Sequence, residues 1–216
     1  MWNEARSNAP GAPSALVQRE AGEVWQESPL VGVGDLLKAH QAGASKKFSL
    51  SERPFRELVN LRGEASDPAF AGAVESVTGC LPPAKPNTVA RGNGYDVLWL
   101  GPDEWLVRSH QPQGAALEAK LRQALAGQFA SAVDIGSGYT VLEVSGEKVR
   151  EVLARGCPLD LHPRVFAPGQ CAQSHYFKAS IVLVPLSGDS FELVVRRSFA
   201  DYFCRIMLDA AEPLLS

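Results

Sequence analysis

The sequence predicts an α+β fold, with helices on one face of a mainly antiparallel sheet. Segments with strand-like and helix-like patterns of apolar residues alternate along the chain. Short turn sequences join two pairs of strands into hairpins, at residues 101–103 (GPD) and at residues 187–189 (SGD). The expected order of strand, helix, hairpin and helix occurs twice, which indicates two split β-α-β units.

Each expected element rests on a local pattern. Strands show alternating or continuous apolar residues, whereas helices show apolar residues three and four positions apart. The expected strands are residues 56–62, 95–100, 104–109, 140–144, 175–185 and 190–196. The expected helices begin after Asp67, at residue 114, after Ser145 and after Ser198.

The first helix has the clearest end signals. Asp67 is a good N-cap, and Pro68 suits the first helical position, where its missing N–H costs nothing. Gly79 is expected to end the helix. Residues 81–86 contain three prolines and are therefore expected to form an extended connection.

Residues 132–163 combine a strand, a tight turn and a helix in one unbroken stretch. Apolar residues alternate over residues 140–144, so one face of this strand can be buried. Ser145 is expected to cap the following helix. Gly156 is expected to end it in a conformation that tolerates positive φ, and Pro158 prevents its continuation.

The composition is that of an ordinary soluble globular protein. The chain has 216 residues, of which 45% are hydrophobic and 21% charged, and its formal net charge is −3 at pH 7. This balance argues against nucleic acid as a partner. The N-terminus lacks the apolar core of a secretory signal, and the longest apolar run, residues 181–186, is too short to span a membrane. Four scattered cysteines then favour a cytoplasmic chain with free thiols.

Residues 1–47 are expected to form a flexible N-terminal arm and linker, and residues 48–216 a single domain. Residues 24–37 carry many apolar side chains, Trp25 among them, but also two glycines that weaken a helix. Apolar surface left in water costs ~25 cal/mol for each Å². We therefore expect this arm to pack on another subunit. The alternative is that it folds back over its own sheet.

Six residues are candidates for a subunit interface or a vestigial ligand pocket: Trp25, Trp99, Trp105, Asp134, Arg196 and Arg197. Asp134 precedes two glycines where the backbone can approach a ligand closely. The plainer interpretation is a turn carboxylate that accepts backbone N–H bonds, and we favour it. Arg196 and Arg197 precede a helix N-terminus and could hold an anion, but arginine is also enriched at protein interfaces, which we favour here.

Trp99 and Trp105 flank the first hairpin turn, which is expected to decouple the faces on which they lie. At least one is expected to be a core residue, and an aromatic beside Pro102 can also anchor a partner.

No motif in the sequence indicates a cofactor or a metal in this chain. The histidines and cysteines at residues 157–175 lack the close spacing of metal ligands. The glycine-rich stretches at residues 92–94 and 136–138 lack the third glycine and the context of a dinucleotide fingerprint. We therefore assign no catalytic, cofactor-binding or metal-binding residue.

Several longer motifs occur in a fixed order. They are LWLGPDEWL at residues 98–106, DIGS at 134–137 with VSG at 144–146, CPLDLHP at 157–163 with FAPGQCAQ at 166–173, and RRSFADY at 196–202. The second resembles the strand that opens the folate-binding domain of aminomethyltransferases, the glycine-cleavage T-protein fold. The others resemble the gamma subunit family of heterotetrameric sarcosine oxidases. The resemblance covers the chain from about Ser28 to its C-terminus.

This resemblance implies a complex that oxidatively demethylates sarcosine to glycine. Its products include hydrogen peroxide and, with tetrahydrofolate, methylenetetrahydrofolate. The resemblance places FAD, FMN, NAD and the folate site in the alpha and beta subunits and zinc in the delta subunit. The present chain would be a non-catalytic gamma subunit that contributes architecture and contacts, with a domain similar to the aminomethyltransferase folate-binding domain.

One departure from the fold family supports the non-catalytic interpretation. Aminomethyltransferases keep an acidic pair before the strand that corresponds to residues 181–184, and one of those acids assists the folate chemistry. Here the positions hold Ala179 and Ser180, which cannot ionise.

Three alternatives stay open. A stand-alone tetrahydrofolate-binding, aminomethyltransferase-like protein is one, and the lost acids count against it. The second is the iron–sulfur maintenance branch of the fold, whose signature does not match residues 167–171. An unrelated α+β binding module is the third, and the ordered motifs count against it.

Overall fold

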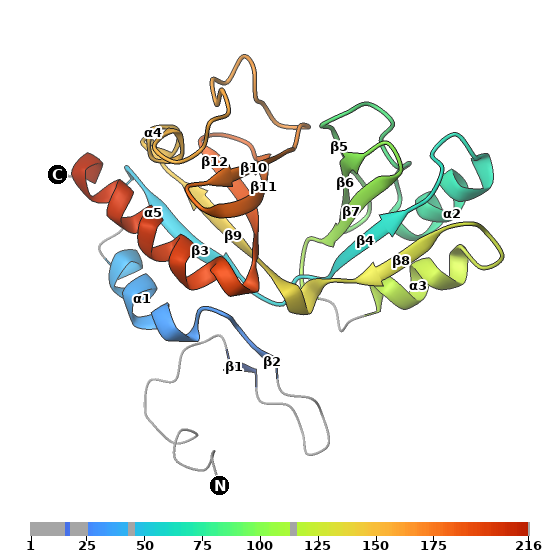
Figure 1. Ribbon diagram of the computed structural model, residues 1–216, viewed down its shortest axis with the longest axis horizontal. Helices are drawn as coiled ribbons and strands as arrows, with labels where there is room; N and C mark the ends of the chain where they lie inside the picture. Colours follow the sequence, from blue (N-terminus) through green and yellow to red (C-terminus); the bar gives the residue numbers. More distant parts are fainter. Residues whose placement is uncertain (1–15, 18–25, 43–45, 113–115, 216) are drawn as a thin grey trace, which may run out of the picture.

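The computed structural model describes residues 16–17, 26–42, 46–112 and 116–215. These residues form four layers, in which two five-stranded sheets lie between two sets of helices (Figure 1). All the strand pairs are antiparallel. The α+β class and the antiparallel pairing predicted from the sequence are therefore confirmed, but the strands divide between two five-stranded sheets and a two-stranded one.

The first sheet has the strand order β10-β11-β12-β9-β3. Its strands are β3 (Ser49–Arg53), β9 (Tyr139–Ser145), β10 (Ala172–Tyr176), β11 (Ala179–Pro185) and β12 (Ser190–Arg196). The helices α1 (Gly34–Ala42), α4 (Val149–Ala154) and α5 (Ala200–Leu215) cover its outer face (Figure 1).

The second sheet has the order β5-β6-β7-β4-β8. Its strands are β4 (Leu58–Arg62), β5 (Val89–Arg91), β6 (Tyr95–Gly101), β7 (Glu104–Ser109) and β8 (Ser131–Asp134). Helices α2 (Pro68–Thr78) and α3 (Leu117–Ala124) cover its outer face (Figure 1).

The two halves of the chain repeat one plan. In the first half β4, α2, β5, β6, β7 and α3 follow one another, and in the second β9, α4, β10, β11, β12 and α5 do the same. The strand orders β5-β6-β7-β4 and β10-β11-β12-β9 correspond position by position. In the first half, the connection through α2 and β5 joins the parallel strands β4 and β6, and β7 lies between them. In the second half, the connection through α4 and β10 joins β9 and β11 in the same way, with β12 between them. The two split β-α-β units are thus present.

One strand of each half pairs in the sheet of the other half. Strand β3 directly precedes β4 in sequence but pairs with β9, and β8 directly precedes β9 but pairs with β4. The chain therefore crosses between the sheets twice, at residues 54–57 and at residues 135–138. We call this arrangement the strand exchange.

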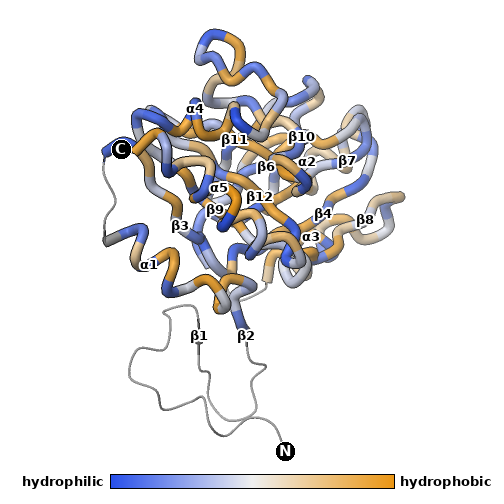
Figure 2. The backbone as a smooth tube through the Cα atoms, turned by 60° about the vertical axis from the view of Figure 1, so that its left-hand side comes forward, coloured by the Kyte–Doolittle hydropathy of each residue, from blue (hydrophilic) through white to orange (hydrophobic). Residues whose placement is uncertain are grey.

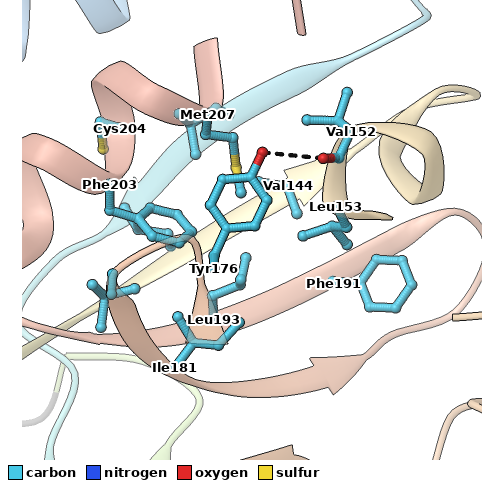
Figure 3. Packing of buried hydrophobic residues seen from close by; sticks show 14 of the residues in the cluster. Val144, Val152, Leu153, Tyr176, Ile181, Phe191, Leu193, Phe203, Cys204 and Met207 are labelled. Carbon is cyan, nitrogen blue, oxygen red and sulfur yellow. Dashed lines mark hydrogen bonds between the residues drawn. The ribbon is translucent and has the colours of Figure 1, made fainter. Parts of the chain in front are cut away.

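Three clusters of buried apolar residues fill the spaces between the layers. The first lies between the first sheet and α1, α4 and α5. There the Tyr176 hydroxyl donates a hydrogen bond to the Val152 carbonyl at 3.0 Å, and its ring lies 5.3 Å from that of Phe203 (Figure 3). The second lies between the other sheet and α2 and α3, and the third joins the facing sides of the two sheets. Accordingly, both sheets are largely apolar in Figure 2.

The end signals of α2 are confirmed. The Ala69 N–H donates to Oδ1 of Asp67 at 2.9 Å, and Pro68 occupies the first position. Gly79 ends the helix at φ 77°, and its N–H donates to the Glu75 carbonyl at 2.7 Å. A side chain in this left-handed conformation is strained, so the position favours glycine.

Four sequence expectations need correction. The expected strand 175–185 is two strands, β10 and β11, because the chain reverses at Phe177, whose φ is 48°. Lys148 rather than Ser145 lies at the start of α4, and Ser198 lies inside a 3-10 turn before α5. Gly156 does not have positive φ. A Cβ there would lie 2.5 Å from the Phe177 ring, so close packing requires glycine.

Part of the expected N-terminal arm belongs to the folded domain. Helix α1 has nine residues, and the buried side chains of Leu30, Val33 and Leu37 join the first core cluster. These three side chains thus fold back on the chain's own sheet, which is the alternative noted above. Strand β1 (Leu16–Val17) pairs with β2 (Gln26–Glu27). Trp25, residues 1–14 and residue 114, the expected start of a helix, lie outside the described residues.

The helices and cysteines add two simpler findings. No helix within the described residues is long and apolar enough to cross a membrane. The four cysteines are all free, as the sequence predicts.

Candidate functional site

The two crossings between the sheets meet at a cavity of about 490 Å³, which we call the crossover pocket. Residues 54–57 line it from the first crossing, and Asp134, Gly136 and Ser137 line it from the second. The crossings lie next to each other because the Ile135 N–H donates to the Leu58 carbonyl at 2.8 Å. Residues 27–29, near the end of β2, and Arg197 complete much of the wall.

Glu52, at the end of β3, lines the pocket with its carboxylate held by two hydroxyl groups. The Ser28 hydroxyl lies 2.8 and 2.6 Å from the two carboxylate oxygens, and the Thr140 hydroxyl donates to Oε1 at 2.7 Å. Both hydroxyl groups are neutral donors, so they give this carboxylate hydrogen bonds but no opposite charge.

Glu57, on the first crossing, is the most deeply buried carboxylate of the pocket, with 8% of its surface exposed. Its Oε1 accepts a hydrogen bond from the Leu117 N–H at 2.8 Å, at the start of α3. Its Oε2 is buried and has no hydrogen-bond partner among the described residues. Burying a carboxylate oxygen without a hydrogen-bond donor lowers the stability of the folded protein.

Asp134 both makes a turn and lines the pocket. Its Oδ1 accepts a hydrogen bond from the Gly136 N–H at 2.8 Å, which matches the turn carboxylate favoured from the sequence. Because the turn lies at the second crossing, the same carboxylate also faces the cavity wall. The turn interpretation is confirmed, and a role beside a ligand stays a prediction.

The neighbouring arginines Arg196 and Arg197 have different surroundings. Arg197 lines the pocket and donates from Nη1 to the Glu27 carbonyl at 3.0 Å. The Arg196 guanidinium lies over the Tyr139 ring, 5.3 Å from its centroid. Both side chains are exposed, so their expected interface role stays a prediction.

Trp99 and Trp105 lie away from the pocket, on the side of the second sheet that faces α2. They are directly opposite each other on β6 and β7 and share one face, so the expectation that the turn decouples their faces is wrong. Trp105 is fully buried, and its Nε1–H donates to the Pro83 carbonyl at 2.9 Å. Trp99 is partly buried beside it.

A buried charge network, which no sequence motif predicted, joins the facing sides of the two sheets. Arg108 on β7 donates from Nη2 to Oδ2 of Asp96 on β6 at 2.7 Å and forms an ion pair with Glu192 on β12. His110 Nε2 lies 2.8 Å from the other Asp96 oxygen. The sequence does contain a sign of this network. Asp96, Arg108 and Glu192 are charged residues inside otherwise apolar strands, at positions where a buried side chain is expected.

Arg56 connects this network to the crossover pocket. It lines the pocket, donates from Nη1 to the Ser109 carbonyl at 2.9 Å, and has Nη2 4.0 Å from Oε1 of Glu192. Burial lowers the pKa of its guanidinium, and the nearby Arg108 charge lowers it further, while Glu192 opposes the change. Arg56 nevertheless stays charged, because arginine titrates far above neutral pH.

We expect the folded protein to lose stability as the pH falls below about 4, because there the Asp96 carboxyl takes up a proton more readily in the unfolded chain than in the folded one. Burial alone would raise the pKa of this carboxyl, but the Arg108 charge and the hydrogen bonds from His110 and Arg108 hold the pKa below its usual 3.8. A carboxyl of this kind stabilises the fold above its unfolded pKa. The contribution disappears as the pH falls through its folded pKa.

Urea unfolding from about pH 6 to pH 2 measures this dependence. The variant Asp96→Asn should show a shallower loss than the wild type. Asp103→Asn, which removes a carboxyl with 67% of its side chain exposed, should keep the wild-type slope. Equal slopes for Asp96→Asn and the wild type would contradict the expectation.

Thiol and metal chemistry find little support in the described residues. Burial raises the pKa of Cys171 to about 11 and that of Cys204 to about 12, so neither thiol is a nucleophile at neutral pH. Within the described residues, no group of three or more His, Cys, Asp or Glu side chains could hold a metal ion.

Comparison with known proteins gives a consistent result. A family model described as "Sarcosine oxidase, gamma subunit family" matches residues 62–212. A sarcosine oxidase subunit gamma from Corynebacterium sp. (strain P-1) is 31% identical, over 82% of this chain and 86% of the relative. One from Arthrobacter sp is 29% identical over the same shares of the two chains.

Two solved structures share the fold. A chain of the heterotetrameric sarcosine oxidase from Corynebacterium sp. U-96 has a TM-score of 0.79 at 28% identity, with 88% of this chain and 97% of that chain covered. Glycine cleavage system aminomethyltransferase T from Bartonella henselae has a TM-score of 0.56 at 16% identity, over 82% of this chain and 49% of that one. The second match concerns the fold alone, and it agrees with the aminomethyltransferase-like fold expected from the sequence.

Proposed function

The chain belongs to the sarcosine oxidase gamma subunit family, and from this membership we propose that it is the non-catalytic gamma subunit of a heterotetrameric sarcosine oxidase. In this role it supports the oxidative demethylation of sarcosine to glycine, with formation of hydrogen peroxide and methylenetetrahydrofolate. The observation that carries the proposal is the structural match, which covers 97% of a chain from such a complex.

The chemistry of Ala179 and Ser180 supports a role without catalysis. Ala179 begins β11 and is fully buried, and Ser180 follows it on the exposed side of the strand. Neither side chain can act as a general acid or base near neutral pH. The fold therefore has no carboxylate where aminomethyltransferases are expected to carry their acidic pair.

The cofactors of the complex fit other subunits better than this chain. Zinc fits poorly because the described residues hold no ligand cluster. Flavin and NAD fit poorly because the sequence lacks a dinucleotide fingerprint. We therefore assign FAD, FMN, NAD and the tetrahydrofolate site to the alpha and beta subunits, and zinc to the delta subunit. We place the complex in the cytoplasm.

Co-expression tests the proposal. An affinity-tagged form of this chain should co-purify with the alpha, beta and delta subunits in equal amounts, and the complex should oxidise sarcosine. The chain purified alone should neither carry a flavin absorbance band nor oxidise sarcosine. Recovery of an active three-subunit oxidase without this chain attached to it would count against the assignment.

The alternative function is a stand-alone tetrahydrofolate-binding, aminomethyltransferase-like protein. The fold shared with aminomethyltransferase T favours it. Calorimetric titration of the purified chain with tetrahydrofolate distinguishes the two, because the gamma-subunit proposal expects a Kd weaker than about 1 µM or no binding. Tighter binding would restore the alternative.

We expect a second-subunit contact at the outer side of α1. Leu36 has 40% of its surface exposed and lines an open groove between α1 and α5, together with Tyr202 and Ile206. An apolar groove of this kind is a surface for a partner chain. Leu36→Asp should weaken assembly of the complex at least about tenfold.

Titration of the tagged chain with the other three subunits measures this effect. Gln41→Asp, an exposed position on the same helix, adds the same charge and should leave assembly unchanged. If both variants assemble like the wild type, the contact lies elsewhere.

A further inference from the structure

The open groove between α1 and α5 carries acidic side chains that have no counter-charge beside them. Asp209 and Glu212 both line the groove, and both are exposed. Within the part of the chain that the structure describes, neither carboxylate forms an ion pair. Arg205, which also lines the groove, is paired with Asp201 at 2.7 Å. The groove therefore combines apolar side chains with net negative charge, which attracts a positively charged partner.

The end of α5 is a second observation that points to such a partner. The last turn of an α-helix has carbonyl oxygens without intrahelical donors, and basic side chains are favourable there. The last turn of α5 has no basic residue, and the acidic Glu212 lies near this end instead. Nζ of Lys47 donates to the Leu215 carbonyl at 3.1 Å and offsets part of the negative charge. The remaining charge suits a cationic partner better than it suits the helix alone.

The form of the groove favours a helix as its occupant. Its volume is about 710 Å³, but it is open to solvent, so a small molecule would keep much of its surface in water. Its walls are the two helices α1 and α5, whose backbone groups bond within each helix, so an added strand would find no backbone partner there (Figure 1). A helix satisfies its own backbone and can lay an apolar stripe on Leu36, Tyr202 and Ile206.

We propose that this groove binds an amphipathic helix of a partner subunit, which places lysine or arginine side chains next to Asp209 and Glu212. The inference rests on the proposed function, because the partner belongs to the same complex. It adds the conformation and the charge of the segment that binds. The competing occupants are a second copy of this chain and its own residues 1–15, and the experiments distinguish them.

Charge reversal in the groove tests the proposal. The tagged double variant Asp209→Lys, Glu212→Lys is titrated with the other three subunits, and its Kd should be at least about tenfold above that of the wild type at low salt. The difference should shrink at about 0.5 M salt, because salt screens exposed charges. The control variant Glu75→Lys, Glu147→Lys makes the same change in net charge at two exposed positions outside the groove, and it should keep the wild-type Kd.

The stability of the isolated chain separates lost attraction from misfolding. Two lysines near the end of α5 complement the helix dipole, so the urea midpoint of the reversed variant should equal or exceed that of the wild type. The neutral variant Asp209→Asn, Glu212→Gln should weaken assembly in the same direction but by less. It decides the question if the reversed variant is destabilised.

A photo-crosslinking amino acid in place of Ala39, which is exposed and lines the groove, identifies the occupant in the assembled complex. Mass spectrometry should place the crosslink on a helical segment of the alpha, beta or delta subunit that carries lysine or arginine beside its apolar stripe. A crosslink to a second copy, to residues 1–15 or to an acidic segment, or none to a partner subunit, would overturn the proposal.

The titration also distinguishes this inference from the proposed function. If the wild type assembles and the reversed and neutral variants bind with the wild-type Kd, the inference is wrong and the proposed function stands. If the wild-type chain does not assemble with the other three subunits, the proposed function is wrong, and the inference with it.

Discussion

Replacing Arg108 with methionine should cost about 3–5 kcal/mol of folding free energy. The Arg108 side chain is 5% exposed and pairs with two carboxylates that are themselves 4% and 10% exposed, Asp96 and Glu192. Removing the cation takes the main partner from both carboxylates and leaves Asp96 with His110 and Glu192 with the Arg56 guanidinium at 4.0 Å. Because Asp96 and Glu192 come from different sheets, we expect the facing sides of the two sheets to separate first.

Urea unfolding followed by circular dichroism measures the loss. Arg62→Met is the matched control, because Arg62 forms ion pairs with Asp103 and Glu104 but has half of its side chain exposed. It should cost no more than about 1 kcal/mol. The triple variant that also replaces Asp96 and Glu192 with leucine should recover part of the stability, since no carboxylate is then left without Arg108, while Arg56 loses its partner Glu192. A small loss for Arg108→Met would show that water reaches the network.

The second large effect is expected at Trp105, where alanine should cost about 3–5 kcal/mol. The side chain is fully buried, and its ring lies 5.5 Å from that of Phe70 on α2. The substitution opens a large cavity between the second sheet and α2, and the Pro83 carbonyl loses the N–H that it accepts. The proline-rich connection that precedes β5 should loosen at the same time.

The opposite residue provides the comparison for this prediction. Trp99→Ala should cost clearly less, because Trp99 is only partly buried although it occupies the cross-strand position. Trp105→Phe should fall between the two, since it keeps most of the ring contacts but loses the hydrogen bond. Equal losses at Trp99 and Trp105 in urea unfolding would contradict the difference in packing described above.

The elements that the sequence predicted well are those specified by neighbouring residues. Helix α2 is specified by Asp67, Pro68 and Gly79, which cap, start and end it through contacts within a few residues. Strands β7 and β12 begin and end where alternation and turn residues place them. Local chemistry was enough in these cases, because each signal acts over one turn or one hairpin.

The elements that were missed depend on distant partners. Strand β3 has the polar sequence SLSER, and its conformation follows from pairing with β9 about ninety positions along the chain. The chain reverses at Phe177 without the glycine, proline or asparagine that usually marks a turn in a sequence. Its left-handed φ instead depends on tertiary packing. Sequence patterns carry little information about either contact.

The lining of the crossover pocket could be anticipated from the sequence only in part, for the same reason. Asp134 and Arg197 were singled out from the sequence, and both line the crossover pocket. The neighbouring Arg196 was singled out too but does not line it. Glu52 and Glu57 were missed, because they become pocket residues only when the first crossing meets the second. Without knowledge of the strand exchange, two crossings about eighty residues apart cannot be placed side by side.

The strand exchange also constrains how the chain can fold while it is being synthesised. Strand β4 can gain both of its neighbours once residue 134 has left the ribosome, but β3 has no strand to pair with until β9 follows at residues 139–145. The sheet that contains β9 closes only after β12 ends at Arg196. The emerging chain therefore carries an unpaired strand edge through most of translation, and such edges are prone to aggregate. Because each five-stranded sheet takes one strand from the other half, we expect a gene split between the halves to yield two chains that must associate before either sheet is complete.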